Sequence, residues 1–506
     1  MSEVDLEPIV QRPTAGRCSR TLPSLASDPS LEDDEPIPEA ALARARYVWE
    51  PGEGVRASDR QPPSVDGGFT VAAVGDLLVS RSVSTLGERD SEFGHVLALL
   101  RTANATFGNF ETTLLDPRVT DGEPQGWEDE SPVHADPELA RDLRAMGFDV
   151  LGRANNHGMD WGRGSLLETD RLLTDAGLIH AGAGVSASAA RAPRYLDLPG
   201  GRLGLVSVTT SPAMPGAAAA DAARGAPGRA GLNVIHARRT VVAPPDVMRR
   251  LQQIIDVVPE LDTRWIPPSP EDGHRIEIGH QAFVEGESFD ERYELDEESV
   301  IENLRSVRLA KQHADVCLFA IHAHQGDQRP ETPRAFLRGL AHSALDVGAD
   351  IVVISGPHRL GPVELYGGGV VLYGLGNFFW HVISEPLQSY LYRDLAPRIA
   401  NRFPDAASVT DMDVDRWLGE DWEEEAFFDA AVATVTFDVA ALGRVELHPV
   451  VLSRSNVAAR AGIPRRADEA SAQRIVEHIA TMSEPLGTTV RFAGGVGVAS
   501  ADAAFD

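Results

Sequence analysis

The sequence contains only two cysteines among its 506 residues, Cys18 and Cys317, and neither has a second cysteine near it. This spacing excludes a disulfide framework and a thiolate zinc cluster. The sequence also lacks an uninterrupted apolar run of about 18 residues, which a membrane-spanning helix needs. Its first twenty residues carry acidic side chains where a secretory signal has a basic region. We therefore expect a cytoplasmic protein without a membrane-spanning segment.

The chain has fewer basic residues than acidic residues. Lys plus Arg total 46 against 76 for Asp plus Glu, which gives a formal net charge of −30. So much negative charge repels phosphate backbones and anionic lipid headgroups, and the scattered arginines form no basic patch. The balance argues against a nucleic-acid partner. It favours neutral or cationic substrates unless a bound metal reverses the charge locally.

The composition is otherwise that of a globular protein, with 43% hydrophobic and 24% charged residues. Residues 1–66 are rich in Pro, Ser, Asp, Glu and Arg, and we predict that they form a disordered leader. Residues 67–460 are predicted to form the main domain, interrupted at about 211–299 by an insertion that contains low-complexity and acid-rich stretches. Residues 461–506 are predicted to form a C-terminal helical and tail segment.

Predicted strands and helices alternate at short spacing on both sides of the insertion. The predicted strands span residues 69–76, 105–111, 148–157, 201–210, 315–324, 350–358, 430–439 and 443–453. Residues 362–379 are predicted to form a β-hairpin, with its turn at the three glycines 367–369. The predicted helices span residues 137–147, 164–177, 245–258, 300–314, 333–348 and 468–482. Such alternation is typical of a layered α/β fold in which functional groups lie on loops beyond the strand ends.

Polar side chains follow five of the predicted strands. They are Asp76; Asn109 and Glu111; Asn155, Asn156 and His157; His322 and His324; and His358. A single histidine at a strand end is usually structural, but the strand ends of a layered sheet converge on one crevice. Carboxylate oxygens and imidazole nitrogens bind divalent cations, so the set predicts a pocket for one or two metal ions. Asp160 and Trp161, which follow His157, are expected to pack against its loop.

Six motifs occur in a fixed order: GDLLVSR, GNFET, ANNHGMDWG, IHAHQGD, GADIVVISGPHRLGPVELY and YGLGNF. Together they resemble the CapA family of poly-γ-glutamate capsule biosynthesis proteins, which is related to calcineurin-like metallophosphoesterases. The resemblance covers roughly residues 69–210 and 300–381. It implies an α/β fold, a four-layer αββα sandwich of the metallophosphoesterase type, with a dinuclear metal centre.

The resemblance also implies roles for individual residues. The implied metal ligands are Asp76, Glu111, Asn155, His322, His324 and His358, and the implied catalytic residues are Asp76, His157 and His324. Glu111 corresponds to a position near the metal bridge, and His157 or His324 to the general acid. Leu78 stands where metallophosphoesterases have the histidine of an Asp-x-His pair, as it does in other CapA family members. Ser355 lies where CapA-like chains usually carry one more histidine, shortly before His358. We therefore expect an incomplete site for Mn, Fe or Zn.

Three functions are compatible with this set of residues. The first is metal-assisted hydrolysis or processing of a peptide, a polyglutamate-type polymer or a phosphoester by a CapA-like enzyme. The second is a metal-independent peptide epimerase, in which carboxylate and imidazole pairs exchange a proton next to a carbonyl group. The third is a non-catalytic subunit that helps to assemble a capsule polymer. A peptide or polyglutamate-type substrate is thus the expected partner.

Overall fold

The computed structural model describes residues 62–116, 118–120, 122–123, 132–212, 214–262, 275–279, 281–325, 331–381, 401, 425–455 and 460–501. The predicted leader therefore lies outside the described residues up to position 61. Within the described positions 62–66, Val65 is buried and its backbone N–H donates to the carbonyl oxygen of Val439 at 3.3 Å. The last residues of the predicted leader are thus packed on the domain.

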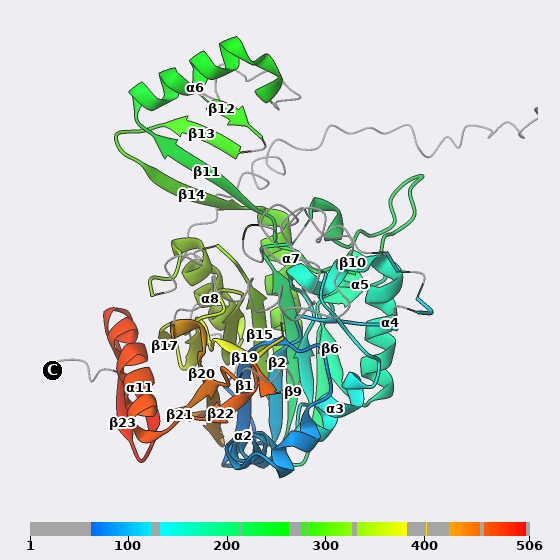
Figure 1. Ribbon diagram of the computed structural model, residues 1–506, viewed down its shortest axis with the longest axis vertical. Coiled ribbons are helices and arrows are strands. Elements are labelled where there is room, and N and C mark those ends of the chain that lie inside the picture. Colours follow the sequence, from blue (N-terminus) through cyan, green and yellow to red (C-terminus); the bar gives the residue numbers. More distant parts are fainter. Residues whose placement is uncertain are drawn as a thin grey trace, which may run out of the picture. The chain divides into compact units, whose positions relative to one another are not determined.

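Ten strands of the described chain form one sheet (Figure 1). Eight of them follow the order β23 (Thr488–Ala493), β24 (Val496–Ala501), β21 (Ala441–Leu452), β20 (Asp429–Asp438), β1 (Phe69–Leu78), β2 (Ala105–Asn109), β5 (Val150–Gly152) and β6 (Ile179–Ala181). The other two are β19 (Asn377–Trp380), which pairs with β1, and β22 (Pro464–Arg466), which pairs with β21. The pairings of β19, β1, β2, β5 and β6 are parallel, whereas β20 pairs with β1 in the antiparallel direction.

Six further strands form a second sheet. Their order is β17 (Val363–Tyr366), β18 (Gly369–Leu372), β16 (Ile351–Ser355), β15 (Val316–His322), β9 (Gly201–Thr209) and β8 (Arg194–Leu198). The four central strands are parallel, and the edge strands β17 and β8 are antiparallel to their neighbours. The predicted hairpin is present as β17 and β18, whose turn places Gly367 and Gly368 at positive φ.

Both sheets bury both of their faces, which explains the near-continuous apolar runs in their sequences. Successive side chains of a strand point to opposite faces. In β1, Val71 belongs to the core shared with the second sheet, whereas Ala72 belongs to the core under the helices of the first sheet. In β15, Leu318 and Phe319 divide in the same way between the shared core and the helix-covered face. The sheets therefore pack face to face through the shared core.

Helices cover the two outer faces. The ten-stranded sheet is covered by α2 (Ser91–Thr102), α3 (Leu139–Met146) and α4 (Gly162–Asp175), which contribute Phe93, Leu143 and Leu173 to its outer core. The six-stranded sheet is covered by α7 (Glu297–His313) and α8 (Ala335–Val347). The predicted layered α/β fold is thus confirmed. No helix in the described part of the chain is long and apolar enough to cross a membrane.

The insertion has a small sheet of its own. Its strand order is β12 (Arg275–Ile278), β13 (Gln281–Glu285), β11 (Ala237–Ala243) and β14 (Asp290–Leu295). The predicted helix is present as α6 (Pro245–Val257) and packs on this sheet through Met248, Ile255 and Ile276. The sequence does not predict the strands, because their segments are short and mix polar with apolar residues. DERYEL of β14 has no fully buried residue.

The C-terminal segment is part of the main domain. The predicted helix is present as α11 (Glu469–Ser483), and its residues Ile475 and Ile479 belong to the core between the two sheets. Strand β24 pairs with β21, so the segment also extends the ten-stranded sheet.

The remaining elements of the described residues are short. They are β3 (Thr113–Leu114), β4 (His134–Ala135), β7 (Ala183–Gly184), β10 (Gly231–Leu232), α5 (Ala187–Arg191) and the 3₁₀ turns at Ser84–Glu88, Asn156–Met159, Pro215–Ala217, Pro259–Leu261, Glu425–Phe427 and Glu484–Leu486.

Candidate metal and acid–base site

The carboxyl ends of the parallel strands bring the predicted residues together. Asp76 of β1 is in register with Asn109, the last residue of β2, and also with Asn377 of β19. In the other sheet, His322 ends β15 in register with Ser355, the last residue of β16. Hydrogen bonds and ion pairs join residues of the two sheets here, so the strand ends of both sheets line one site.

Two glycines allow β1 to meet the neighbouring loop beside Asp76. A Cβ on Gly75 would lie 1.9 Å from the carbonyl oxygen of Gly376, which is far inside a normal contact. Gly376 itself has φ +72°, a conformation that glycine adopts at little cost. The position of Asp76 therefore depends on the absence of a side chain one residue before it.

Asp76 is buried and held on both carboxylate oxygens. Its Oδ1 accepts a hydrogen bond from Asn109 Nδ2 at 2.8 Å. Its Oδ2 accepts one from the backbone N–H of Gly356 at 3.2 Å and lies 3.2 Å from His358 Nδ1. Burial raises the pKa of Asp76, but the hydrogen bond and charge of His358, with help from His322 and Asn109, outweigh burial and hold the pKa well below its usual range. The side chain is therefore an anion at neutral pH.

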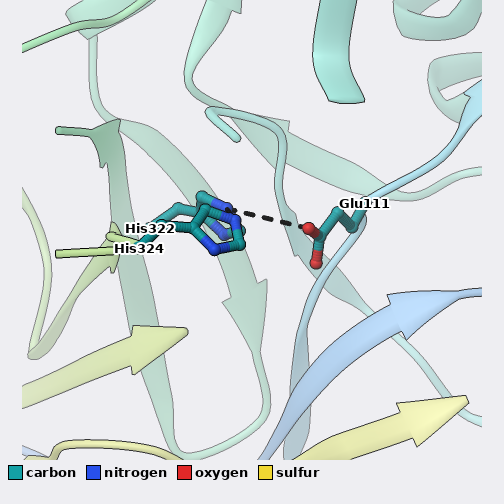
Figure 2. A group of neighbouring side chains, drawn as sticks. All are labelled: Glu111, His322 and His324. Atoms are coloured by element: carbon teal, nitrogen blue, oxygen red, sulfur yellow. Dashed lines mark hydrogen bonds and ion pairs between the residues drawn. The ribbon is translucent and has the colours of Figure 1, made fainter. Parts of the chain in front are cut away.

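Glu111 lies between two groups of possible ligands. One group is Glu111, His322 and His324, and the other is Asp76, Glu111 and His358; within each group the ligand atoms lie within 4.8 Å of one another. The Glu111 carboxylate is completely buried, and its Oε1 is 3.7 Å from His322 Nε2. Figure 2 shows this carboxylate facing the imidazoles of His322 and His324. Glu111 is the one residue that belongs to both of these groups, so it could contribute a ligand atom to either of them.

His322 is suited to bind a metal ion through an imidazole nitrogen, because its ring is neutral. It is 1% exposed, and its Nε2 is 3.1 Å from Nε2 of His324. Burial lowers the pKa of His322 well below its usual value, the positive charge of a protonated His324 lowers it further, and Asp76 opposes the shift only in part. A neutral imidazole keeps a lone pair for a metal ion.

His358 takes its position from an unusual backbone conformation. Among the described non-glycine residues it alone has a positive φ, +56°. Such a conformation costs of order 1 kcal/mol and persists only where neighbouring groups impose it. Here Asn377 contacts the residue twice: its Oδ1 is 2.9 Å from His358 Nδ1, and its Nδ2 donates to the His358 carbonyl oxygen at 3.3 Å. Asn377 thus holds His358, a candidate ligand, in place.

Asn155 presents a buried oxygen that fits a cation. Its side chain is fully buried, and its Nδ2 donates to the carbonyl oxygen of Phe110, the residue before Glu111, at 2.8 Å. Among the described residues its Oδ1 has no hydrogen-bond partner. A buried acceptor without a partner costs about 1–3 kcal/mol, which a metal ion or a substrate donor would remove. The two groups of possible ligands consist of carboxylates and imidazoles, and such donors suit Mn, Fe or Zn.

His157 lies outside both groups of possible ligands and is paired with Asp160. Its Nδ1 is 2.7 Å from Asp160 Oδ2, which also accepts a hydrogen bond from the backbone N–H of Val133 at 2.7 Å. A positive charge on His157 disfavours protonation of His322, so the two rings are within electrostatic reach. The sequence predicts only packing for Asp160, whereas the structure gives it the role of orienting His157. The signal was their spacing of three residues, which places them on one side of a helical turn.

Leu78 and Ser355, which stand in place of metal-binding histidines, make structural contacts. Leu78 is buried, and its carbonyl oxygen accepts a hydrogen bond from the backbone N–H of His381 at 2.7 Å. Ser355 Oγ lies 3.4 Å from His322 Nδ1. The two groups of possible ligands contain three residues each, and neither group includes a residue at these two positions.

Comparisons with known proteins agree with the motifs. The family model described as bacterial capsule synthesis protein PGA_cap matches residues 70–381. The chain is 35% identical to two proteins of Sinorhizobium fredii (strain NBRC 101917 / NGR234), y4sH and y4uA, over 436 residues, which is 85% of this chain and 93% of each relative; both are described as uncharacterized. It is 27% identical over 350 residues to the PGA biosynthesis protein CapA of Bacillus subtilis (strain 168), which is 68% of this chain and 70% of that protein.

Proposed function

The chain belongs to the bacterial capsule synthesis protein PGA_cap family, and from this premise we propose that it is a metal-dependent hydrolase of the metallophosphoesterase type. The observation that carries the proposal is Glu111, a buried carboxylate shared by two groups of possible metal ligands. The two sheets packed between layers of helices support the likeness to metallophosphoesterases. We propose that the bond cleaved is an amide of a peptide or polyglutamate-type polymer, or a phosphoester.

Each residue then has a separate task. The residues that would hold one or two ions are Asp76, Glu111, Asn155, His322, His324 and His358. A bound divalent ion polarises a carbonyl or phosphoryl oxygen and makes a water nucleophile available near neutral pH. Asp76 serves as an anionic ligand, since its lowered pKa keeps it ionised.

We assign the general-acid role to His157 and not to His324, because His324 belongs to a group of possible ligands. Asp160 binds the Nδ1 side of the His157 ring, so His157 would transfer its proton from Nε2 to the leaving oxygen or nitrogen. General-acid catalysis of this kind contributes about 10²–10⁴-fold to the rate.

The test is hydrolysis by protein that is purified without chelator and supplied with Mn, Fe or Zn. Suitable substrates are bis(p-nitrophenyl) phosphate, an alkyl phosphodiester and a γ-linked glutamate oligomer. We expect hydrolysis of at least one substrate, and its loss with a chelator or in Glu111→Gln. His157→Ala should keep the bound metal but lose about 10²–10⁴-fold in kcat on the substrate with the poorer leaving group. It should lose much less on the p-nitrophenyl ester, which needs little protonation.

His478→Ala is a matched control, because His478 is exposed on α11. It should leave kcat unchanged. Hydrolysis that persists unchanged in Glu111→Gln and in the presence of chelator would contradict the proposal.

A second candidate function is supported by a different observation. The site contains two carboxylate–imidazole pairs, Asp76 with His358 and Asp160 with His157, which are already hydrogen-bonded or in ionic contact. Such pairs can remove and return a proton at a carbon next to a carbonyl group without a metal. An epimerase of this kind would incorporate deuterium from heavy water into a peptide substrate in the presence of chelator. A protein inactive in both assays that is retained by a polymer synthase would instead be an assembly subunit.

A further inference from the structure

The loop that carries His322 and His324 is hydrogen-bonded to the residues where the insertion begins. Thr209, the last residue of β9, donates through Oγ1 to the carbonyl oxygen of His322 at 3.2 Å. The backbone N–H of Thr210 donates to the same oxygen at 2.9 Å. The main chain between the two histidines is thus fixed to the neighbouring strand, and these contacts lie outside the groups of possible metal ligands.

Ser211 and Gln325 continue this connection to His324 itself. The backbone N–H of His324 donates to Ser211 Oγ at 2.8 Å, and Ser211 Oγ donates to Gln325 Oε1 at 2.8 Å. Gln325 Oε1 also accepts from Thr210 Oγ1 at 2.8 Å, and Gln325 Nε2 donates to the Thr210 carbonyl oxygen at 2.9 Å. Only this orientation of the amide satisfies both contacts, because the reverse would place its oxygen against a carbonyl oxygen. Each hydroxyl group therefore has a defined hydrogen-bonding direction.

The far end of the neighbouring segment is attached to the same strand end. Thr209 donates through its backbone N–H to the Asn233 carbonyl oxygen at 3.0 Å, and its own carbonyl oxygen accepts from the backbone N–H of Ile235 at 2.9 Å. The segment from Ser211 to Val234 therefore begins next to Thr209 and is hydrogen-bonded to Thr209 again where it ends. This closed attachment makes the first residues of the insertion a firm support for the histidine loop.

We propose that Ser211 and Gln325 are positioning residues that hold His324 in reach of Glu111 and His322. The proposal rests on the proposed function, since it takes His324 as a metal ligand. The three ligand atoms of this group lie within 4.8 Å of one another, and a ligand must be held to within about 0.5 Å to bind well. Hydrogen bonds that orient ligands typically contribute about 10–100-fold to metal affinity.

The experiment compares Ser211→Ala, Ser211→Thr and Gln325→Ala with the full-length wild-type chain. Ser211→Thr keeps the hydroxyl group, so it is the conservative variant expected to restore function. Ser500→Ala is a matched control, because Ser500 Oγ donates to the carbonyl oxygen of Thr489 at 3.5 Å, between β24 and β23 and outside the insertion. The first measurement is amide hydrogen exchange of the peptide that contains His324, without metal. The second is the dissociation constant for Co²⁺, obtained by competition with a chromophoric chelator.

We expect the His324 amide to exchange at least about 10-fold faster in Ser211→Ala, because its hydrogen bond is lost. Co²⁺ affinity should fall by about 10-fold or more in Ser211→Ala and in Gln325→Ala. Ser211→Thr and Ser500→Ala should match the wild type in both measurements. Unchanged exchange in Ser211→Ala would show that the hydrogen bond does not form, and faster exchange with unchanged Co²⁺ affinity would show that it does not position a ligand. Either result overturns this proposal while the wild type still binds Co²⁺; a wild type that binds none overturns the proposed function and, with it, the positioning role.

Discussion

Replacing Glu364 with glutamine should lower the free energy of unfolding by about 2–3 kcal/mol at pH 7. Glu364 of β17 is 2% exposed. Tyr373 OH donates to its Oε2 at 2.7 Å, Arg338 Nη2 donates to its Oε1 at 2.8 Å, and His342 Nε2 lies 3.0 Å from Oε2. Burial opposes ionisation, but these contacts outweigh it and lower the pKa of Glu364 from 4.5 to about 2.

The magnitude follows from this shift. A lowering of the pKa from 4.5 to about 2 at about 1.4 kcal/mol per pH unit gives an upper value of about 3.5 kcal/mol. The Arg338 side chain is 43% exposed, so solvent screens part of its attraction and reduces the expected value. Because the pKa of the folded state is below that of the unfolded state, the stabilisation is fully present above about pH 4.5 and is lost as the pH falls toward 2.

The assay is urea unfolding of the wild type and Glu364→Gln, followed by circular dichroism at pH 7, 5.5, 4.5 and 3.5. The difference between the two proteins should stay constant from pH 7 to 5.5 and become smaller below pH 4.5. Glu168→Gln is the control, since Glu168 pairs with Arg171 at 45% and 55% exposure and should change stability by less than about 0.5 kcal/mol. A difference below 0.5 kcal/mol at pH 7 for Glu364→Gln, or one that does not depend on pH, would refute the reasoning.

Two further substitutions test the buried ion pair of Lys311 with Asp350 and the close contact between Gly75 and Gly376. Lys311→Met removes the cationic partner of Asp350, a completely buried carboxylate that accepts from Lys311 Nζ at 2.9 Å and from the backbone N–H of Cys317 at 2.8 Å, and should cost about 3–5 kcal/mol in urea unfolding. The double variant with Asp350→Asn, which is neutral and keeps an acceptor for Cys317, should recover much of this loss; a cost below 1 kcal/mol for the single variant would be inconsistent with a buried pair. Gly75→Ala would place a Cβ 1.9 Å from the Gly376 carbonyl oxygen, so we expect a lower melting temperature and weaker Mn²⁺ binding. The control Gly164→Ala has no atom within 4 Å of the added Cβ and should have neither effect. Equal melting temperatures and equal Mn²⁺ affinities of the two variants would disprove the close approach of Gly75 to Gly376.

Most of the two main sheets could be predicted from the sequence because their strands are buried on both faces. Continuous apolar runs such as the one from Phe69 therefore indicate strands without ambiguity. The chain's passage from β18 in one sheet to β19 in the other could not be predicted, since the run through Leu372 and Asn377 reads as one hairpin. The strands of the insertion and β23 and β24 were missed because short, half-exposed strands have no strong apolar pattern.

The candidate site was predictable to the extent that strand ends determine it. Parallel register places Asp76 beside Asn109, and the same rule places His322 beside Ser355. The supporting contacts were not predictable, because they depend on loop conformation. Gln325, for example, lies within the motif IHAHQGD. Nothing in that motif indicates that Gln325 is hydrogen-bonded to Thr210 and Ser211, which are 115 and 114 positions away in the sequence.

Metal analysis of protein purified without chelator tests the central claim most directly, which is that Glu111 joins two groups of metal ligands. After incubation with Mn, Fe or Zn and removal of free ions, the wild type should retain at least one ion per chain. Glu111→Gln should retain almost none, whereas His358→Ala should lose only the ion that depends on Asp76 and His358. The Glu168→Gln protein should retain as much metal as the wild type. A wild type that holds no metal, or a Glu111→Gln variant that holds the wild-type amount, would contradict the account.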